Sequence, residues 1–316
     1  MRMDGWIAAV TCALLAASLV ACRGAAGDDA VVKIGRPGAT VAAHAPAASP
    51  TQPGTPVPPP EVILSTSSAS QGSAILVSVV GDISGGSITF LNRQYRLAQG
   101  SQSMYAFIAV GADDPVGASS VKIDFTLRTG SKGSITENVS VTPTRWPSDS
   151  VEVPAALVPL LDPAVQDAET AQLSQYYGAF TSPKLWTGPW RAPVQAPVTT
   201  RFGDLRSYNG GPVSGHHSGT DLGTPVVATN SGRVVMARQL RVHGNMVIID
   251  HGGGVYSGYA HLSSFAAAEG QVVNAGDIIG YVGNTGLSTG AHLHREMSVG
   301  GVLVDPMKFS DGSGGF

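Results

Sequence analysis

Two histidines separated by one residue, His292 and His294, lie near the end of a chain of 316 residues, and Glu296 follows at the same spacing. Side chains alternate between the two faces of a β-strand, so a strand would present all three on one face. Two imidazoles on one face either repel each other when protonated or share a cation or a reaction centre. A site of this kind needs further ligands from elsewhere in the chain.

Those further ligands are present about seventy residues upstream, where His217 and Asp221 are four residues apart. Glycines and a proline in this segment oppose a helix, so an extended segment presents both side chains on one side. Three nitrogen or carboxylate ligands and one open position form the pattern of a catalytic zinc site, whereas a structural site closes with four ligands. Between the two motifs, His261 is a spare histidine for proton transfer.

The spacing of these histidines, together with the residues between them, resembles the lysostaphin/LytM-type zinc metalloendopeptidases. The similarity covers approximately residues 193–309, a little over a third of the chain. Besides the histidine motifs, four stretches are similar to that family: residues 223–228, 244–252, 276–280 and 304–306. The specificity lies in three short motifs that occur in the right order and at the right spacing.

The resemblance implies one zinc ion, held by His217, Asp221 and His294, and catalytic roles for His261 and His292. Spacing alone does not tell which of His292 and His294 binds zinc, and neither spacing nor resemblance decides which catalytic histidine is the general base.

Three further residues belong to the predicted site. We expect Glu296 either to orient a ligand from behind the metal or to form an ordinary salt bridge. By resemblance, Arg206 and Tyr208 line the groove, although the segment from Asp204 to Arg206 departs from the family's arginine-rich form.

Composition favours a mostly β protein, because 40 glycines and 21 prolines indicate many turns rather than long helices. The formal net charge of -3 excludes a strong electrostatic case for nucleic-acid binding. The two cysteines are Cys12 and Cys22, so the rest of the chain has neither a disulfide nor a cysteine zinc site.

The first residues are typical of a bacterial lipoprotein. Residues 1–21 contain an apolar run shorter than the ~20 residues that span a bilayer, which predicts a signal peptide. The run ends in a lipobox-like stretch before Cys22, which predicts cleavage and acylation there; a plain signal peptide is the alternative. We therefore expect a lipid-anchored protein of the cell envelope, on the periplasmic face of the outer membrane or the outer face of the cytoplasmic membrane. Residues 22–60, rich in proline and alanine, read as a disordered tether.

The remaining chain divides into three predicted parts. Residues 61–143 alternate apolar and polar residues between turns and resemble an immunoglobulin-like β-sandwich, which serves as a spacer or docking module or covers the groove as an inhibitor. Residues 144–192 form a connector with one helix, which starts after Asp162 and ends at Gly178. Residues 193–316 form an antiparallel β catalytic domain of the lysostaphin/LytM type, with a helical turn expected over residues 263–269.

Within the connector, Val165, Ala168 and the run from Ala171 to Leu173 predict a partial apolar stripe on the helix. Four aromatic residues either form a stacking surface for a sugar or peptide or, the interpretation we favour, pack the connector onto the catalytic domain: Tyr176, Tyr177, Trp186 and Trp190.

The histidines outside the motif are expected to be structural. We expect His216 to be exposed, His243 to be a turn residue, and His251 to pack or hydrogen-bond at the end of a strand.

Together these features predict a zinc endopeptidase that hydrolyses the peptide cross-links of bacterial peptidoglycan during remodelling of the cell wall. Two alternatives remain: a non-enzymatic activator of cell-wall amidases, and a general secreted zinc endopeptidase. The intact ligand set argues against the first, because such activators lose ligands. The sequence gives no oligomeric state.

Overall fold

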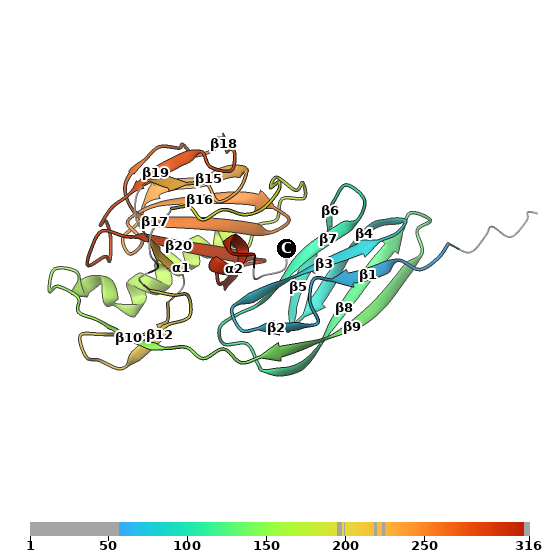
Figure 1. The fold of residues 1–316 in the computed structure, drawn as a ribbon, viewed down its shortest axis with the longest axis horizontal. Coiled ribbons are helices and arrows are strands. Elements are labelled where there is room, and N and C mark those ends of the chain that lie inside the picture. Colours follow the sequence, from blue (N-terminus) through green and yellow to red (C-terminus); the bar gives the residue numbers. More distant parts are fainter. Residues whose placement is uncertain (1–56, 195–197, 199, 218–219, 223–224, 313–316) are drawn as a thin grey trace, which may run out of the picture. The chain divides into compact units, whose positions relative to one another are not determined.

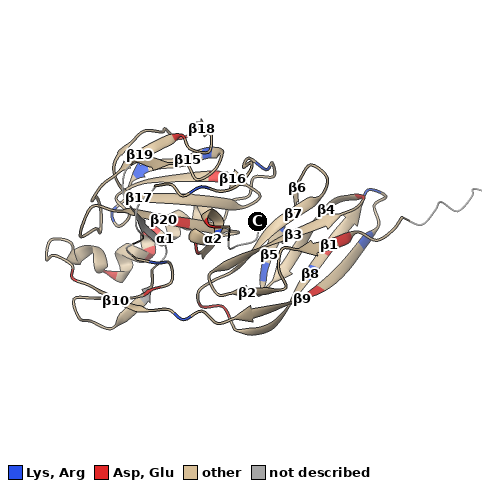
Figure 2. Ribbon diagram, in the orientation of Figure 1, with Lys and Arg blue, Asp and Glu red and all other residues tan. Residues whose placement is uncertain are grey.

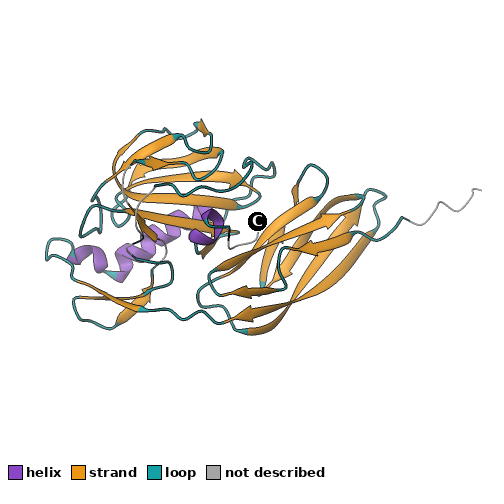
Figure 3. Cartoon of the chain, in the orientation of Figure 1, coloured by secondary structure: helices purple, strands orange, loops and turns teal. Residues whose placement is uncertain are grey.

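Short strands separated by glycine-rich turns make up most of the described chain, as the composition predicted (Figures 1 and 3). The computed structural model describes residues 57–194, 198, 200–217, 220–222 and 225–312, and of residues 215 and 220–222 only the backbone. The predicted signal peptide, Cys22 and the tether up to residue 56 lie outside the described residues and remain predictions. Among the described residues, no helix combines the length and apolarity needed to cross a membrane.

The strands after the tether form two sheets that share one apolar core. The first sheet has the order β1-β3-β7-β6, with bounds Glu61–Leu64, Ser73–Val80, Met104–Val110 and Ala98–Gln99. The second has the order β2-β9-β8-β4-β5, with bounds Ser68–Ser70, Lys132–Thr142, Gly117–Leu127, Ile83–Phe90 and Arg93–Arg96. The predicted alternation holds on β8, where Val121 and Ile123 are buried and Lys122 between them is exposed. The two sheets form a β-sandwich, and its immunoglobulin-like character stays a prediction.

One strand of the sandwich is buried along its whole length. All seven residues of β7 are buried, because it packs on the connector as well as on the sandwich core. The rings of Tyr105 and Phe107 lie 6.2 and 5.8 Å from that of Trp186. Trp186 and Trp190 are themselves buried. Tyr177, Trp186 and Trp190 therefore pack rather than form an exposed stacking surface, Trp186 against the sandwich, while Tyr176 is only partly buried. Residues 55–316 form one compact unit, and the predicted boundaries within it remain predictions.

The connector contains the predicted helix. It follows β10 (Ser148–Val151) and the 3-10 turn η1 (Val158–Leu161), and α1 itself runs from Pro163 to Tyr177. The carboxylate of Asp162 accepts a hydrogen bond from the N–H of Ala164 at 2.9 Å, so Asp162 caps the helix as expected.

The predicted apolar stripe of α1 is confirmed at Leu173, which is buried, and wrong at Ala168. Ala168 is exposed, and the buried residues are Glu169, Leu173 and Tyr177, four residues apart on one face. Periodicity of apolar residues missed this face because two of its three side chains end in polar atoms.

The remaining strands form one small sheet and one large sheet. The small sheet has the order β10-β11-β12, with β11 at Leu205–Tyr208 and β12 at Val213–His216. The main path of the large sheet is β13-β20-β17-β16-β15-β18, with bounds Thr220–Leu222, Leu293–Val299, Val255–Phe265, Asn245–Gly252, Gly232–Gln239 and Val272–Val273. Three strands join it beside this path: β14 (Val226–Val227), β19 (Ile278–Val282) and β21 (Val302–Val304). A short helix, α2 (Met307–Ser310), follows.

All pairings that the large sheet makes are antiparallel, as the tight spacing of its strands predicted. The helical turn expected over residues 263–269 is wrong, since β17 extends to Phe265 and pairs there with β19. Figure 2 shows the described Lys and Arg residues dispersed among Asp and Glu residues, with no element carrying a basic stripe.

Candidate active site

A cleft of about 300 Å³ gathers histidines from distant parts of the chain. Six of the eight histidines line it: His216, His217, His243, His261, His292 and His294. Arg206 and Tyr208, predicted as groove residues, also line it. The connector supplies a further part of the wall, through Val151, Val153, Gln166, Glu169 and Thr170. The predicted motif histidines are thus brought together, and the connector adds residues that the sequence pattern did not indicate.

His217 and His294 face each other across this cleft. His217 Nε2 lies 3.0 Å from His294 Nδ1. The opposite nitrogens face groups that only accept: His217 Nδ1 donates to the carbonyl of Arg201 at 2.9 Å, and His294 Nε2 donates to Glu296 Oε1 at 3.2 Å. Each ring in its neutral form therefore turns a lone pair toward the other. Two such lone pairs repel unless a proton or a metal ion lies between them, so the two nitrogens can serve as metal ligands.

Asp221 is positioned through the backbone. It lies on β13, whose register places it opposite His294 on the neighbouring antiparallel strand β20. Its side chain is outside the described residues, so its role as a ligand remains a prediction.

His261 and His292 lie beside this pair. Their ring centroids are 4.8 Å apart, and the ring of His261 is 5.7 Å from that of His294. His261 Nδ1 donates to the carbonyl of Thr285, and His292 Nδ1 to the carbonyl of Gly290, both at 2.8 Å. In both neutral rings the Nε2 atom is therefore an acceptor. Burial, reinforced by the neighbouring histidines His294 and His292, lowers the pKa of His261 to about 3, which keeps its imidazole neutral.

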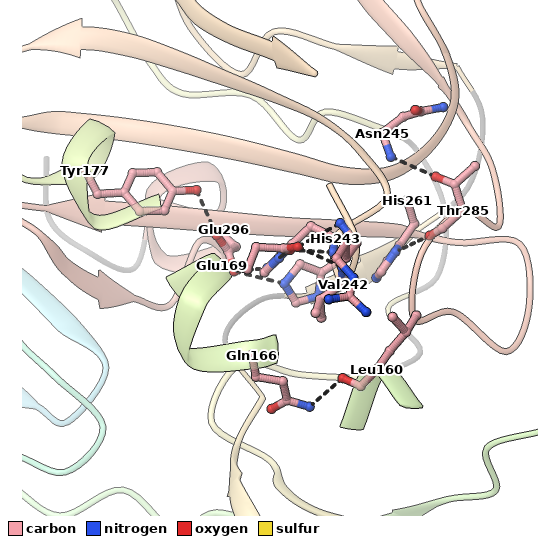
Figure 4. Close-up of polar contacts among 12 residues, drawn as sticks. Leu160, Gln166, Glu169, Tyr177, Val242, His243, Asn245, His261, Thr285 and Glu296 are labelled. Atoms are coloured by element: carbon pink, nitrogen blue, oxygen red, sulfur yellow. Dashed lines mark hydrogen bonds and ion pairs between the residues drawn. The ribbon is translucent and has the colours of Figure 1, made fainter. Parts of the chain in front are cut away.

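The backbone of His261 is strained. Its φ of 59° lies in the left-handed region, which costs a residue with a side chain about 1–2 kcal/mol. The N–H of His261 donates to the carbonyl of His243 at 2.9 Å, and Asn245 Nδ2 donates to the carbonyl of Leu262 at 3.0 Å. Asn245 N–H in turn donates to Thr285 Oγ1 (Figure 4). These bonds hold an irregular stretch of β17 and thereby fix the direction of the His261 ring.

Glu296 lies behind His294. It is buried, and its two oxygens accept from the hydroxyl of Tyr177 at 2.8 Å (Figure 4), from His294 Nε2 at 3.2 Å and from His243 Nε2 at 3.4 Å. Burial alone would raise the pKa of Glu296, but hydrogen bonds from His243 and His294 outweigh burial and hold it well below its usual value. Of the two expectations for Glu296, this geometry favours the orienting role.

His243 is more than a turn residue. Its Nδ1 lies 2.7 Å from Glu169 Oε1 and its Nε2 faces Glu296, so both nitrogens meet carboxylates. Burial lowers its pKa, but the hydrogen bonds to Glu169 and Glu296 raise it to about 10. The ligand atoms of His243, His294 and Glu296 lie within 4.8 Å of one another. Both nitrogens of His243 face carboxylates that only accept, which leaves no lone pair for a metal, so this trio is a hydrogen-bonded array.

The other two histidines differ from each other. The expectation that His216 is exposed is wrong: its side chain is 18% exposed, and its nitrogens lie 2.7 Å from the carbonyl of Gly203 and 3.0 Å from Asp113. His251 is fully buried and bonds to the carbonyl of Ser231 and the hydroxyl of Ser257, the structural role expected.

Comparison with known proteins finds matches over the segment that carries the histidine motifs. Residues 212–306 match the model of peptidase family M23. The peptidoglycan DD-endopeptidase ShyA of Vibrio cholerae is 46% identical over 96 residues, which are 29% of this chain and 22% of that protein. The murein hydrolase activator NlpD of Salmonella dublin is 34% identical over 144 residues, 45% of this chain and 37% of that protein. The chain therefore spans well under half the length of these curated relatives.

Among solved structures, a Pseudomonas aeruginosa protein described as an M23 peptidase shares the fold. Its TM-score is 0.56 at 22% sequence identity, and the match covers 76% of this chain and 93% of that one. The shared fold thus extends beyond the segment that the family model matches. Residues 212–306, which carry the histidine motifs and much of the cleft, therefore match peptidase family M23, and the wider fold is that of the Pseudomonas aeruginosa structure.

Proposed function

We propose that this protein is a zinc-dependent endopeptidase that hydrolyses the peptide cross-links of bacterial peptidoglycan. One observation carries the proposal: the ring nitrogens of His217 and His294 face each other with their lone pairs. The imidazoles of His261 and His292 lie beside this pair. Asp221, opposite His294 in the strand register, is the proposed third ligand. Zinc in such a site supplies acidity to a water molecule and polarises a carbonyl group.

The proton transfers fall to His261 and His292. Each ring donates from Nδ1 to a backbone carbonyl, which fixes its tautomer and turns Nε2 into the acceptor. One of the two takes a proton from the attacking water, and the other stabilises the developing oxyanion or protonates the leaving amine. Both assignments of these two roles remain open.

The substrate class follows from the relatives. ShyA is named a peptidoglycan DD-endopeptidase, so we propose the D-alanyl cross-link to diaminopimelate as the bond cut here. Acylation at Cys22 and a tether over residues 22–60 would hold the enzyme in the cell envelope within reach of this wall. Replacing Cys22 with serine tests the anchor: we expect the variant to leave the membrane fraction, and unchanged fractionation would contradict acylation.

A second candidate rests on the likeness to NlpD, which is named an activator of murein hydrolases. An activator requires no metal, whereas the facing nitrogens of His217 and His294 fit one.

The deciding experiment uses the chain from Arg23 onward, incubated with purified cross-linked peptidoglycan with and without a chelator. We expect mass spectrometry to show loss of cross-linked dimers, abolished by the chelator, and the product masses to name the bond. Intact cross-links, together with a protein that binds no zinc and stimulates a cell-wall amidase, would support the activator instead. Cleavage of casein at a comparable rate would support a general endopeptidase.

A further inference from the structure

Helix α1 buries an unusual face toward the cleft. Its three buried side chains are Glu169, Leu173 and Tyr177, which follow one another at four-residue intervals. Leu173 packs in an apolar cluster with Met246 and Ile248 of the large sheet. The other two end in a carboxylate and a hydroxyl, and buried polar groups of this kind require partners.

Glu169 binds the segment before β16 through four donors. Its two oxygens accept from the N–H groups of Arg241, Val242 and His243, each at 2.8 Å, and from His243 Nδ1 at 2.7 Å. A carboxylate with four donors holds both the backbone of this bend and the ring of His243 in one orientation. The helix thus determines where His243 Nε2 points.

Tyr177 reaches the same network by a second route. Its hydroxyl donates to Glu296 Oε2 at 2.8 Å, while Glu296 Oε1 faces His243 Nε2 at 3.4 Å and His294 Nε2 at 3.2 Å. Figure 4 shows Glu169 and Tyr177 approaching from α1, with Glu296 and His243 among the labelled side chains of this network. Two residues of one helix therefore converge on the carboxylate that holds His294, one directly and one through His243.

We propose that Glu169 and Tyr177 are positioning residues that hold Glu296, and through it the ring of His294, in the orientation that a metal requires. The proposal deepens the proposed function, on which it rests. The N–H of a metal-binding histidine is oriented by its acceptor, and loss of such outer partners lowers metal affinity by about 10–100-fold. The connector helix is accordingly part of the active site rather than a spacer before it.

Two variants test this proposal with small changes in shape. Tyr177→Phe removes one hydroxyl and keeps the ring, which packs against Tyr256 at a centroid distance of 6.2 Å. Glu169→Gln replaces an oxygen that accepts hydrogen bonds by an NH₂ group that cannot. The matched controls lie on the same helix: Tyr176→Phe for the first, and Asp167→Asn, at an exposed position, for the second.

The measurement is the affinity for Co²⁺, by competition with a coloured chelator, together with the visible absorption spectrum of the Co²⁺ protein. We expect about a tenfold weaker affinity and an altered spectrum for both variants, and unchanged values for both controls. Melting temperatures, measured in parallel, separate this effect from simple destabilisation, which does not change the spectrum of the folded protein.

The outcomes distinguish the two proposals. Wild-type protein that binds Co²⁺ but cuts no peptidoglycan would overturn the proposed function and leave the positioning role supported if the variants still bind more weakly. Cleavage by the wild type, with Co²⁺ affinity and spectrum identical in Tyr177→Phe and Glu169→Gln, would overturn the positioning role alone. A wild-type protein without Co²⁺ affinity would overturn both.

Discussion

The β-sandwich and the histidine-bearing sheet are built from similar strands, yet they bury different side chains. Within the described residues of the sandwich, Ser73 is the one buried polar residue, and the rest of its core is apolar or aromatic. On β20, by contrast, all seven residues are buried, and among them are a histidine, an arginine, a glutamate and a serine.

This difference teaches how each sheet is stabilised. Any close packing of apolar side chains stabilises the folded state. A strand with buried polar side chains is stable only if each polar group forms a hydrogen bond or ion pair with a specific partner. The partners of His294 and Glu296 are His217 directly after β12, His243 in the bend before β16, and Tyr177 on α1. The buried polar groups of the histidine-bearing sheet therefore depend on specific partners in segments outside that sheet.

The largest effect is expected from a substitution that removes one histidine of the His217–His294 pair. His294→Ala removes one of two facing nitrogens, and we expect it to abolish zinc retention and to lower cross-link hydrolysis by roughly 10³-fold or more. Elemental analysis and the peptidoglycan assay measure the two quantities. Lys122→Ala, at an exposed position on β8 of the sandwich, is the control and should change neither. Full zinc content in His294→Ala would remove this histidine from the metal site.

A core substitution in the sandwich should lower the stability of the protein and leave metal binding unchanged. Ile123 is fully buried on β8, so Ile123→Ala leaves a cavity and should lower the free energy of unfolding by about 2–5 kcal/mol. Denaturant unfolding measures this loss. Co²⁺ affinity of the folded variant should equal that of the wild type, and weaker binding would show that the two sheets are not independent in this respect.

A smaller effect appears as a pH dependence of stability. Burial alone would raise the pKa of Glu169, but hydrogen bonds from His243 and from the backbone of Val242 lower it from 4.5 to about 2. Because the folded pKa lies below the unfolded one, the stabilisation is present above pH 4.5 and is lost as the pH falls toward about 2.

The stability difference between wild type and Glu169→Gln should therefore shrink as the pH falls from 7 to 3.5, by roughly 1 kcal/mol. Urea unfolding at several pH values gives this difference. Asp167→Asn should show no comparable trend, and a difference independent of pH for Glu169→Gln would argue that the carboxylate is not ionised in the folded protein.

The smallest effect concerns the start of α1. Asp162 caps the helix through Ala164, so Asp162→Ala should lower the free energy of unfolding by about 1 kcal/mol. Thermal unfolding measures the change. Glu169 lies two turns further along, so Co²⁺ affinity should stay near the wild-type value; a tenfold loss would mean that the whole helix, and not its buried face alone, orients the site.

Local signals in the sequence determined much of the protein. The mostly β class, the antiparallel large sheet and the start and end of α1 follow from turns, alternation and a capping residue, all of which act over a few neighbouring residues. The histidine motifs led to the family in the same way. His217, His261, His292 and His294 line one cleft in the folded chain, while their roles as ligands and catalysts remain predictions.

Only the tertiary structure decided what lies behind these histidines. Glu169 is 74 residues from His243, and Tyr177 is 119 residues from Glu296, so no spacing rule links them. The left-handed backbone of His261 and the charge of His243 likewise depend on groups that folding brings close. Apolar periodicity is a property of the chain itself, whereas the partner of a buried polar group is chosen by the packing of distant segments, and that is why the network around Glu296 could not be predicted.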